Sequence, residues 1–243
     1  MFKRKLVIGD IHGALRALQQ CLDRANVTSG DQLIFLGDYA DGWSETGQLI
    51  DFLIDLQQYI DCVFIKGNHD VFCLNYLKGE PMSSNWFLYG GKATADCYEQ
   101  NSFDTSKHID FLSQLKNFYI DKDNKLFIHA GYTSLQGPLA EKDENTYYWD
   151  RTLWETAIAS DPQLTSENIR YPARFKLFKE IYIGHTPILK YGTFHPMNQL
   201  NLWNMDTGAA YNGHLTIMDI DTKQFWQSDL VPTLYPGVQG RTD

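Results

Sequence analysis

The chain has 243 residues, which suits one medium-sized α/β domain or at most two small ones. Hydrophobic residues make up 43% of it and aromatic residues 14%, enough to bury a sizeable core. The formal net charge of −9 argues against a broad basic surface, so neither nucleic acid nor a membrane is expected as a partner. A small anionic ligand stays compatible with this charge, because a bound metal ion reverses the local sign.

The N-terminus and the cysteines favour a cytoplasmic protein. The apolar run after Lys5 is shorter than the core of a signal peptide, and no stretch approaches the length of a membrane span. Cys21, Cys62, Cys73 and Cys97 show no CxxC spacing, and four cysteines in a chain this long do not suggest a disulfide framework. We therefore expect reduced thiols, most of them buried.

The first third of the chain alternates between strand and helix patterns. Short apolar runs predict strands at 5–9, 33–36 and 63–65. Apolar residues at helical spacing predict helices at 15–25 and 49–56. This alternation predicts parallel strands joined by crossover helices.

The rest of the chain has a different character. Residues 118–131 and 215–229 are each expected to form a hairpin, with a helix at 152–159 and a strand at 181–183 between them. The stretch 78–103 is rich in Gly, Ser and aromatic residues without a flexible spacer, so we interpret it as the border of an active site. The pattern predicts a single domain over residues 1–243, with strands paired parallel at its start and antiparallel later.

Five of the expected strands end in polar residues that can bind metal. The motifs are GDIHG, GDYAD, GNHD, HAG and GHTP. Ligand sites of α/β sheets lie at the carboxyl ends of strands, and glycine allows the sharp turn that such ends need. A single strand-end Asp or His is typical of a turn, a cap or a surface position. All five together predict one site.

Carboxylate and imidazole ligands in this number suit a pair of divalent ions such as Mn, Fe or Zn. Two neighbouring ions need a shared ligand, and Asp38 of the middle motif is the natural bridge. Two divalent ions outweigh the charges of Asp10 and Asp38. The site would therefore be positive and would attract phosphate.

With these motifs the chain resembles the calcineurin-like metallophosphoesterases, and most of all their bacterial-type phosphoprotein phosphatase branch. The family pattern is GDxHG, GDxVDRG, GNHE, H[AG]G and a final GH. The match runs from Asp10 to His185 and on to the MDTGA stretch at 205–209. The resemblance implies an α/β fold, a four-layer α-β-β-α sandwich of two mixed sheets flanked by helices.

The resemblance also implies two divalent metal ions as cofactors, Mn²⁺ first, with Fe or Zn as alternatives. The implied metal ligands, with Asp38 as the bridge, are Asp10, His12, Asp38, Asn68, His129 and His185. A hydroxide on the metals would be the nucleophile. His69 would be the general acid, paired with Asp41, and Asn68 would also contact the substrate.

One position departs from the family pattern. The second motif usually has Arg after its second Asp, and this chain has Gly42 followed by Trp43. A lost bidentate contact to phosphate is worth roughly 1.5–3 kcal/mol. Arg151 is the candidate replacement, against the alternative of a surface ion pair with neighbouring acids. Lys92 is a weaker candidate that fits a solvated lysine better, and Trp43 fits a packing role.

The first interpretation is a metallophosphatase, a phosphoric monoester hydrolase acting as a serine/threonine or dual-specificity protein phosphatase. Its partner would be a phosphoprotein or a small phosphoester. The alternative is a dinucleoside polyphosphate hydrolase resembling symmetrical diadenosine tetraphosphatases, which share GDxHG and GHTP. A nuclease or phosphodiesterase is disfavoured, because Pro187 stands where those relatives carry a second His. An inactive, ligand-sensing relative is a further alternative. It is disfavoured, because such a protein would not need to retain every metal ligand.

Overall fold

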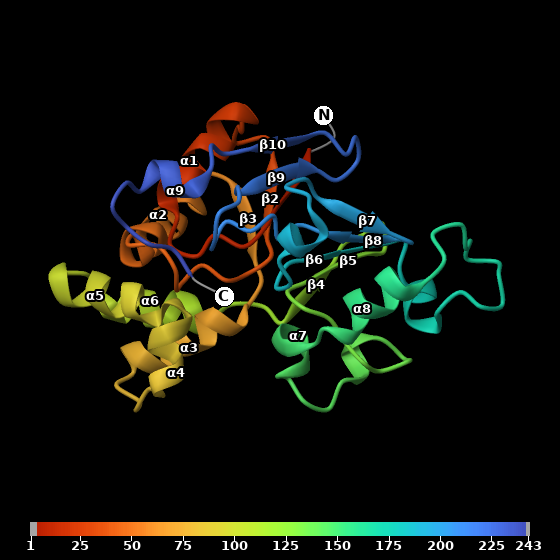
Figure 1. Ribbon diagram of the computed structural model, residues 1–243, viewed down its shortest axis with the longest axis horizontal. Helices are drawn as coiled ribbons and strands as arrows, with labels where there is room; N and C mark the ends of the chain where they lie inside the picture. Colours follow the sequence, from red (N-terminus) through yellow and green to blue (C-terminus); the bar gives the residue numbers. More distant parts are fainter. Residues whose placement is uncertain (1–3, 242–243) are drawn as a thin grey trace.

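Residues 4–241 are described in a computed structural model. Over this range the strands form two five-stranded mixed sheets that pack face to face, with helices over their outer faces (Figure 1). This is the α-β-β-α arrangement that the resemblance implies, and the expectation is confirmed.

The first sheet has the order β10-β9-β1-β2-β3. Its strands are β1 (Lys5–Ile8), β2 (Gln32–Phe35), β3 (Asp61–Phe64), β9 (Thr216–Asp219) and β10 (Phe225–Gln227). The pairs β1–β2 and β2–β3 are parallel, with Val7 opposite Ile34 and Ile34 opposite Val63. The parallel start predicted from the alternating pattern is confirmed.

The second sheet has the order β4-β5-β6-β8-β7. Its strands are β4 (Phe118–Ile120), β5 (Lys125–Ile128), β6 (Glu180–Ile183), β7 (Met197–Gln199) and β8 (Leu202–Asn204). The expectation of antiparallel pairing in the later chain is wrong at the centre of this sheet, where β5–β6 and β6–β8 are parallel. The long connection between β5 and β6 returns the chain to the same end of the sheet, which makes parallel pairing possible. β7 and β8 were not predicted, because three-residue strands carry little periodic signal.

Helices cover the outer face of each sheet. The helices and turns that follow the first three strands are α1 (Leu15–Arg24), α2 (Thr46–Leu56), α3 (Asn68–Leu77), α4 (Ser84–Trp86), the kinked turn η1 (Phe87–Gly91), α5 (Lys92–Gln100) and α6 (Thr105–Ser113). Those of the later chain are η2 (Pro138–Ala140), α7 (Thr146–Trp149), α8 (Thr152–Ala159), η3 (Ala173–Leu177), η4 (Ile188–Tyr191) and α9 (Val231–Leu234). The helix expected at 152–159 is α8.

A layer of apolar side chains joins the two sheets. Val7, Ile34 and Met218 of the first sheet meet Phe127 and Tyr182 of the second, and all five are fully buried. Phe127 and Tyr182 stack with their ring centroids 4.9 Å apart. Each buried side chain of this size contributes about 1.5–3 kcal/mol relative to exposure. This layer holds the sheets together, so that the carboxyl ends of their parallel strands share one edge.

The four cysteines are free thiols, three of them buried and Cys62 partly exposed. Within residues 4–241, no helix is both long and apolar enough to cross a bilayer.

Candidate metal centre

Six strands deliver polar side chains to the shared edge of the two sheets. The loops after β1, β2 and β3 carry the first three motifs, β5 and β6 lead into HAG and GHTP, and β8 leads into the MDTGA stretch. The buried residues at this edge are Asp10, His12, Asp38, Asp41, Asn68, His69, His129, His185 and Asp206. The structure thus places every predicted metal ligand and the predicted dyad together. Asp206 was not singled out from the sequence, although its stretch was recognised as a continuation of the pattern.

Four of these side chains start from unusual backbone. His12, Asp38, Asp41 and His185 have φ values of 52°, 54°, 67° and 66°, in the left-handed region that non-glycine residues seldom adopt. Such a conformation costs about 1–3 kcal/mol and persists only where the surroundings enforce it. The turns therefore keep a strained geometry that aims these side chains along the sheet edge.

Two motif glycines leave room for carboxylates. A Cβ on Gly67 would lie 2.1 Å from Asp38 Oδ1, and a Cβ on Gly184 would lie 1.9 Å from Asp10 Oδ1. Both distances are far shorter than any tolerable contact. The glycines of GNHD and GHTP are thus required by the carboxylates of other motifs.

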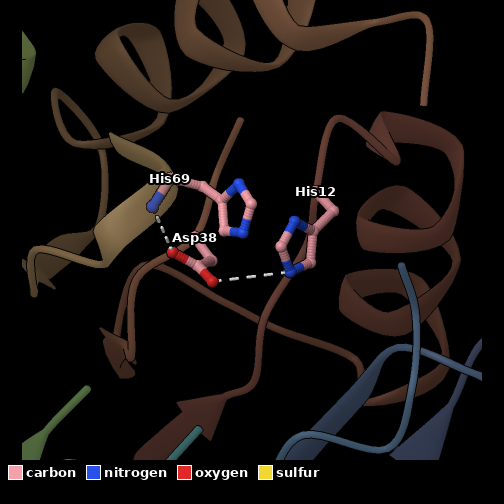
Figure 2. Close-up of side chains that lie close together, drawn as sticks. All are labelled: His12, Asp38 and His69. Carbon is pink, nitrogen blue, oxygen red and sulfur yellow. Dashed lines mark hydrogen bonds and ion pairs between the residues drawn. The ribbon is translucent and has the colours of Figure 1, made fainter. Parts of the chain in front are cut away.

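Asp38 lies at the centre of the candidate ligands. It belongs to two groups of converging donor atoms, one with His12 and His69 and one with His129 and His185. Its Oδ2 is 3.5 Å from His12 Nε2 and 3.4 Å from His129 Nε2. Figure 2 shows Asp38 between His12 and His69, with its Oδ1 accepting a 2.9 Å hydrogen bond from the backbone amide of His69. This placement suits a carboxylate shared by two ions.

Backbone carbonyls orient two of the imidazoles. His12 Nδ1 lies 2.7 Å from the carbonyl oxygen of Asp41, and His129 Nδ1 lies 2.8 Å from that of Leu36. A carbonyl can only accept, so each Nδ1 carries a proton and Nε2 is the nitrogen that a metal ion would bind. That arrangement is typical of metal-binding histidines.

Two buried polar atoms of the candidate ligands have no hydrogen-bond partner within residues 4–241. They are Asp10 Oδ1 and His185 Nε2. Asn68 Oδ1 lies 3.2 Å from His129 Nε2 and 3.0 Å from His185 Nδ1, so ligand-type atoms crowd together here. Buried polar atoms are normally paired, and a cation would satisfy this set. The residues present fit divalent metal ions.

The charges of the protein alone conflict at this site. Burial and the charge of Asp206 raise the pKa of Asp10 well above its usual range, and burial raises the pKa of Asp206 to about 6. Burial alone would lower the pKa of His129, but the Asp38 carboxylate raises it to about 10. Burial lowers the pKa of His12 to about 3. A bound cation would stabilise the ionised forms of Asp10 and Asp206 and would take the place of the proton on His129.

His69 and Asp41 form a buried pair beside these ligands. His69 Nδ1 lies 2.8 Å from Asp41 Oδ2. Trp86 Nε1 donates to the same oxygen at 2.7 Å, and the Thr94 hydroxyl donates to Asp41 Oδ1 at 2.7 Å. The carboxylate is thus held by three donors and fixes the His69 ring with Nε2 free for proton transfer. Trp86 and Thr94 were not predicted individually, but both lie in the stretch 78–103 interpreted as a site border.

Asp70 has a different task. Its carboxylate accepts hydrogen bonds from the backbone amides of Gly67, Asp38 and Tyr39 at 2.7–2.9 Å. These hydrogen bonds therefore connect the GDYAD turn with the GNHD turn. The Asp that ends GNHD supports the loops rather than facing the cavity.

A cavity of about 480 Å³ opens over the candidate ligands. Its base contains His12, Asp38, Asn68 and His69. Its aromatic lining consists of Phe72, Trp86, Tyr89, Trp149 and Tyr211. Arg151 and Arg241 also line it, and both line a neighbouring cavity of about 670 Å³ that extends to Lys190.

Arg151 lies where the sequence suggested a phosphate clamp. Its side chain is exposed and makes no ion pair within the described chain, so the predicted alternative of a surface ion pair is not observed there. Asp150 instead caps α8, accepting from the amides of Thr152 and Leu153. The clamp role of Arg151 stays a prediction.

The two other residues considered near the missing arginine have structural roles. Lys92 is exposed on α5 and pairs with Asp96, one turn along the helix. Trp43 is buried, donates from Nε1 to the carbonyl oxygen of Ala209 at 2.7 Å and stacks on Tyr235. Neither lines the cavity over the candidate ligands.

Curated proteins similar to this chain share a name. A bis(5′-nucleosyl)-tetraphosphatase PrpE (asymmetrical) from Anoxybacillus flavithermus is 25% identical over 227 residues, which cover 87% of this chain and 88% of the relative. A protein of the same name from Bacillus subtilis is 22% identical over 224 residues, covering 86% of this chain and 88% of the relative.

Solved structures show the same fold. One, provisionally described as a diadenosine tetraphosphatase, superposes with a TM-score of 0.64 at 20% identity and covers 93% of this chain and 92% of its own. A cold-active protein-tyrosine phosphatase from a Shewanella species superposes with a TM-score of 0.61 at 13% identity, covering 94% and 81%.

The family model for calcineurin-like phosphoesterases matches residues 3–216. Members of this family use divalent metal ions, and the candidate ligands here are arranged to hold them. On the match, the fold and the site, this chain belongs to the calcineurin-like phosphoesterases.

Proposed function

We propose that this protein is a metal-dependent hydrolase that cleaves a P–O–P bond of dinucleoside polyphosphates. The main observation behind the proposal is the cavity over the candidate metal ligands, which combines an aromatic lining with two arginines. The names of the similar curated proteins support the same substrate class and favour asymmetrical over symmetrical cleavage. The branch suggested first by the motifs, the phosphoprotein phosphatases, has less support.

The shape and chemistry of the cavity suit such a substrate. Aromatic rings such as Trp149 and Tyr89 offer flat faces on which a nucleobase can stack. Arg151 and Arg241 lie between this cavity and its neighbour, which reaches Lys190. A chain of phosphates needs several cations in a row, because each phosphate brings charge. A single phosphoserine would use only part of this arrangement.

The residues of the chain have distinct tasks in this proposal. Divalent cations, when bound, would activate water and withdraw charge from the phosphate under attack. Asn68 and Arg151 hold the phosphate oxygens. His69, fixed by its 2.8 Å contact to Asp41, gives its Nε2 proton to the leaving oxygen.

A phosphomonoesterase is the second candidate, and the His69–Asp41 pair is the observation that favours it. An alkoxide is a strongly basic leaving group, so a positioned proton donor matters most for phosphoserine or phosphothreonine. A phosphate leaving group is much less basic and needs the donor less. The pair therefore favours a phosphomonoester substrate, although it can also serve a phosphate leaving group.

A direct comparison of substrates tests the proposal. Metal-stripped protein is reloaded with Mn²⁺, Fe²⁺ or Zn²⁺ and given diadenosine tetraphosphate, a phosphothreonine peptide or p-nitrophenyl phosphate. We expect kcat/KM for the dinucleotide to exceed that for the peptide at least about 100-fold, a difference of roughly 2.7 kcal/mol. Chromatography of the products gives the cleaved bond, since asymmetrical cleavage yields ATP and AMP and symmetrical cleavage yields ADP alone. The reverse ratio would support the protein phosphatase instead.

A further inference from the structure

The last described residue, Arg241, reaches the candidate active site from far along the chain. After α9 the chain turns back toward the middle of the molecule (Figure 1). The amide of Arg241 donates to the carbonyl oxygen of Ala210 at 2.8 Å, which ties this segment to the loop after β8. A Cβ on Gly240 would lie 2.6 Å from Trp43 and 2.7 Å from the Ala210 oxygen. The segment is thus packed closely against buried structure.

The stem of the Arg241 side chain occupies space that two glycines leave open. Its Cγ would lie 3.8 Å from a Cβ on Gly42 and 3.0 Å from a Cβ on Gly90. Gly42 has a φ of 139°, which disfavours any residue with a side chain. Because Gly42 has no side chain, there is room beside it for the aliphatic part of the Arg241 side chain. The position where the family pattern has Arg is therefore in contact with an arginine from the C-terminal segment.

The guanidinium group lines the cavity, and no carboxylate of residues 4–241 forms an ion pair with it. Its Cζ lies 5.2 Å from the centroid of the Tyr211 ring, and Arg241 lines the cavity together with His12 and Asp206. Its Nε is buried and has no hydrogen-bond partner within residues 4–241. By contrast, Arg4, Arg16 and Arg24 each form an ion pair with a carboxylate. Burying an unpaired guanidinium nitrogen is costly unless a ligand supplies the acceptor.

We propose that Arg241 binds a phosphate group of the substrate next to the metal ligands, with Arg151 as the second cation of the cavity. A guanidinium binds a phosphate through two parallel N–H···O contacts, which a lone ammonium cannot make. The inference rests on the proposed function in one respect, namely that the ligand carries phosphate. Arg241 contributes binding and orientation of phosphate, and the proton transfer stays with His69.

Inorganic phosphate is the probe that tests this, because it does not depend on which phosphate ester is the substrate. Calorimetric titration of metal-loaded protein compares wild type with Arg241→Ala and Arg241→Gln. The control is Arg24→Gln, an exposed arginine paired with Asp229 on another face, which makes the same change in net charge. Metal content and thermal unfolding are measured for each variant.

We expect both Arg241 variants to bind phosphate about 10- to 100-fold more weakly than wild type with unchanged metal content, as for a lost charge-assisted pair. Guanidinium chloride at about 20 mM, well below the molar range that unfolds proteins, should restore part of the affinity of Arg241→Ala and leave the control unchanged. The aliphatic part of the Arg241 side chain packs near Gly90, so Arg241→Ala could unfold for lack of this contact. In that case the phosphate affinity of Arg241→Gln tests the inference, since glutamine keeps most of the aliphatic part.

Three results would overturn the inference. These are wild-type affinity in a folded, metal-loaded Arg241 variant, an equal loss in the Arg24 control, and no phosphate binding by the metal-loaded wild type. Phosphate binding that depends on Arg241 in a protein that does not cleave dinucleoside polyphosphates would leave the inference standing and reject the proposed function.

Discussion

Asp38 combines three constraints in one side chain. It adopts left-handed backbone, it lies within 3.5 Å of two imidazole nitrogens, and it accepts a hydrogen bond from the amide of His69. Burial would raise its pKa, but His129 and His69 hold it well below the usual range. A carboxylate that stays ionised while buried is suited to binding cations. The local strain thus serves to place a negative charge between the two candidate ion positions.

Replacing Asp38 should therefore remove metal. We expect Asp38→Asn to lose at least one of two bound ions and to lower turnover by more than about 100-fold, because the bridging charge is gone. Elemental analysis and hydrolysis of p-nitrophenyl phosphate measure both effects. Asp229→Asn, a surface carboxylate paired with Arg24, is the control. Two ions retained at wild-type affinity in Asp38→Asn would rule out the bridging role.

The role of His69 predicts a dependence on the leaving group. We expect His69→Asn to lower kcat about 10²- to 10⁴-fold for alkyl phosphates, whose leaving groups need a proton. The loss should be much smaller for p-nitrophenyl phosphate and for phosphoanhydrides, whose leaving groups are weak bases. A series of aryl and alkyl phosphates measures the slope of log kcat against leaving-group pKa. An equal loss for every substrate would assign His69 to the metal or to structure instead.

The strand-end turns depend on one another, since two of their glycines make room for a carboxylate from another turn. Gly184 at the end of β6 faces Asp10 from the turn after β1, and His185 donates its amide to Asp10 Oδ2 at 2.9 Å. Gly67 after β3 faces Asp38 from the turn after β2. The turns must therefore be assembled together, and one enlarged turn displaces a ligand of its neighbour.

Gly184→Ala tests this coupling. Its Cβ would lie 1.9 Å from Asp10 Oδ1, so we expect Asp10 to shift and metal affinity to fall at least about 10-fold, the lower range for disturbed metal sites. Gly30→Ala is the matched control, because its Cβ meets only Thr28 Oγ1, at 3.5 Å. Metal titration of both variants gives the comparison. Equal metal affinity in the two would mean that the turn adapts without moving Asp10.

The molecule as a whole brings two sheets together at an edge full of buried polar groups. The apolar layer between the sheets holds this edge in place, while Asp10 Oδ1 and His185 Nε2 are left without partners in the part of the chain described. Desolvated acids and unpaired atoms destabilise the folded state unless cations bind. Folding and metal binding should therefore be strongly linked.

This linkage predicts a large shift in thermal stability. A metal at 100 times its dissociation constant stabilises the folded state by about 2.7 kcal/mol, or roughly 5–10 °C for a chain of this size. We expect Mn²⁺ to raise the unfolding temperature of stripped protein by that amount and a chelator to reverse it. Asp38→Asn should show a much smaller shift. An unfolding temperature that no divalent ion changes would contradict a metal centre at this edge.

The sequence by itself determined the parts of the protein that local patterns encode. Apolar runs ending in glycine and a ligand-type residue located the strands of GDIHG, GDYAD and GNHD, and the same pattern identified His129 and His185. These patterns can be recognised in the sequence because a strand, its turn and its ligand residue are neighbours in the chain. The set of candidate ligands was therefore predictable before their distances were known.

Only the tertiary structure decided what depends on distant segments. The parallel pairing of β5, β6 and β8 depends on connections that carry no pairing signal of their own. Trp86 and Thr94 reach Asp41 across 45 and 53 residues. Arg241 lies against Gly42, although most of the chain lies between them in the sequence. Contacts of this kind depend on packing and on which surfaces can be buried together. No local stretch of the sequence determines either of these.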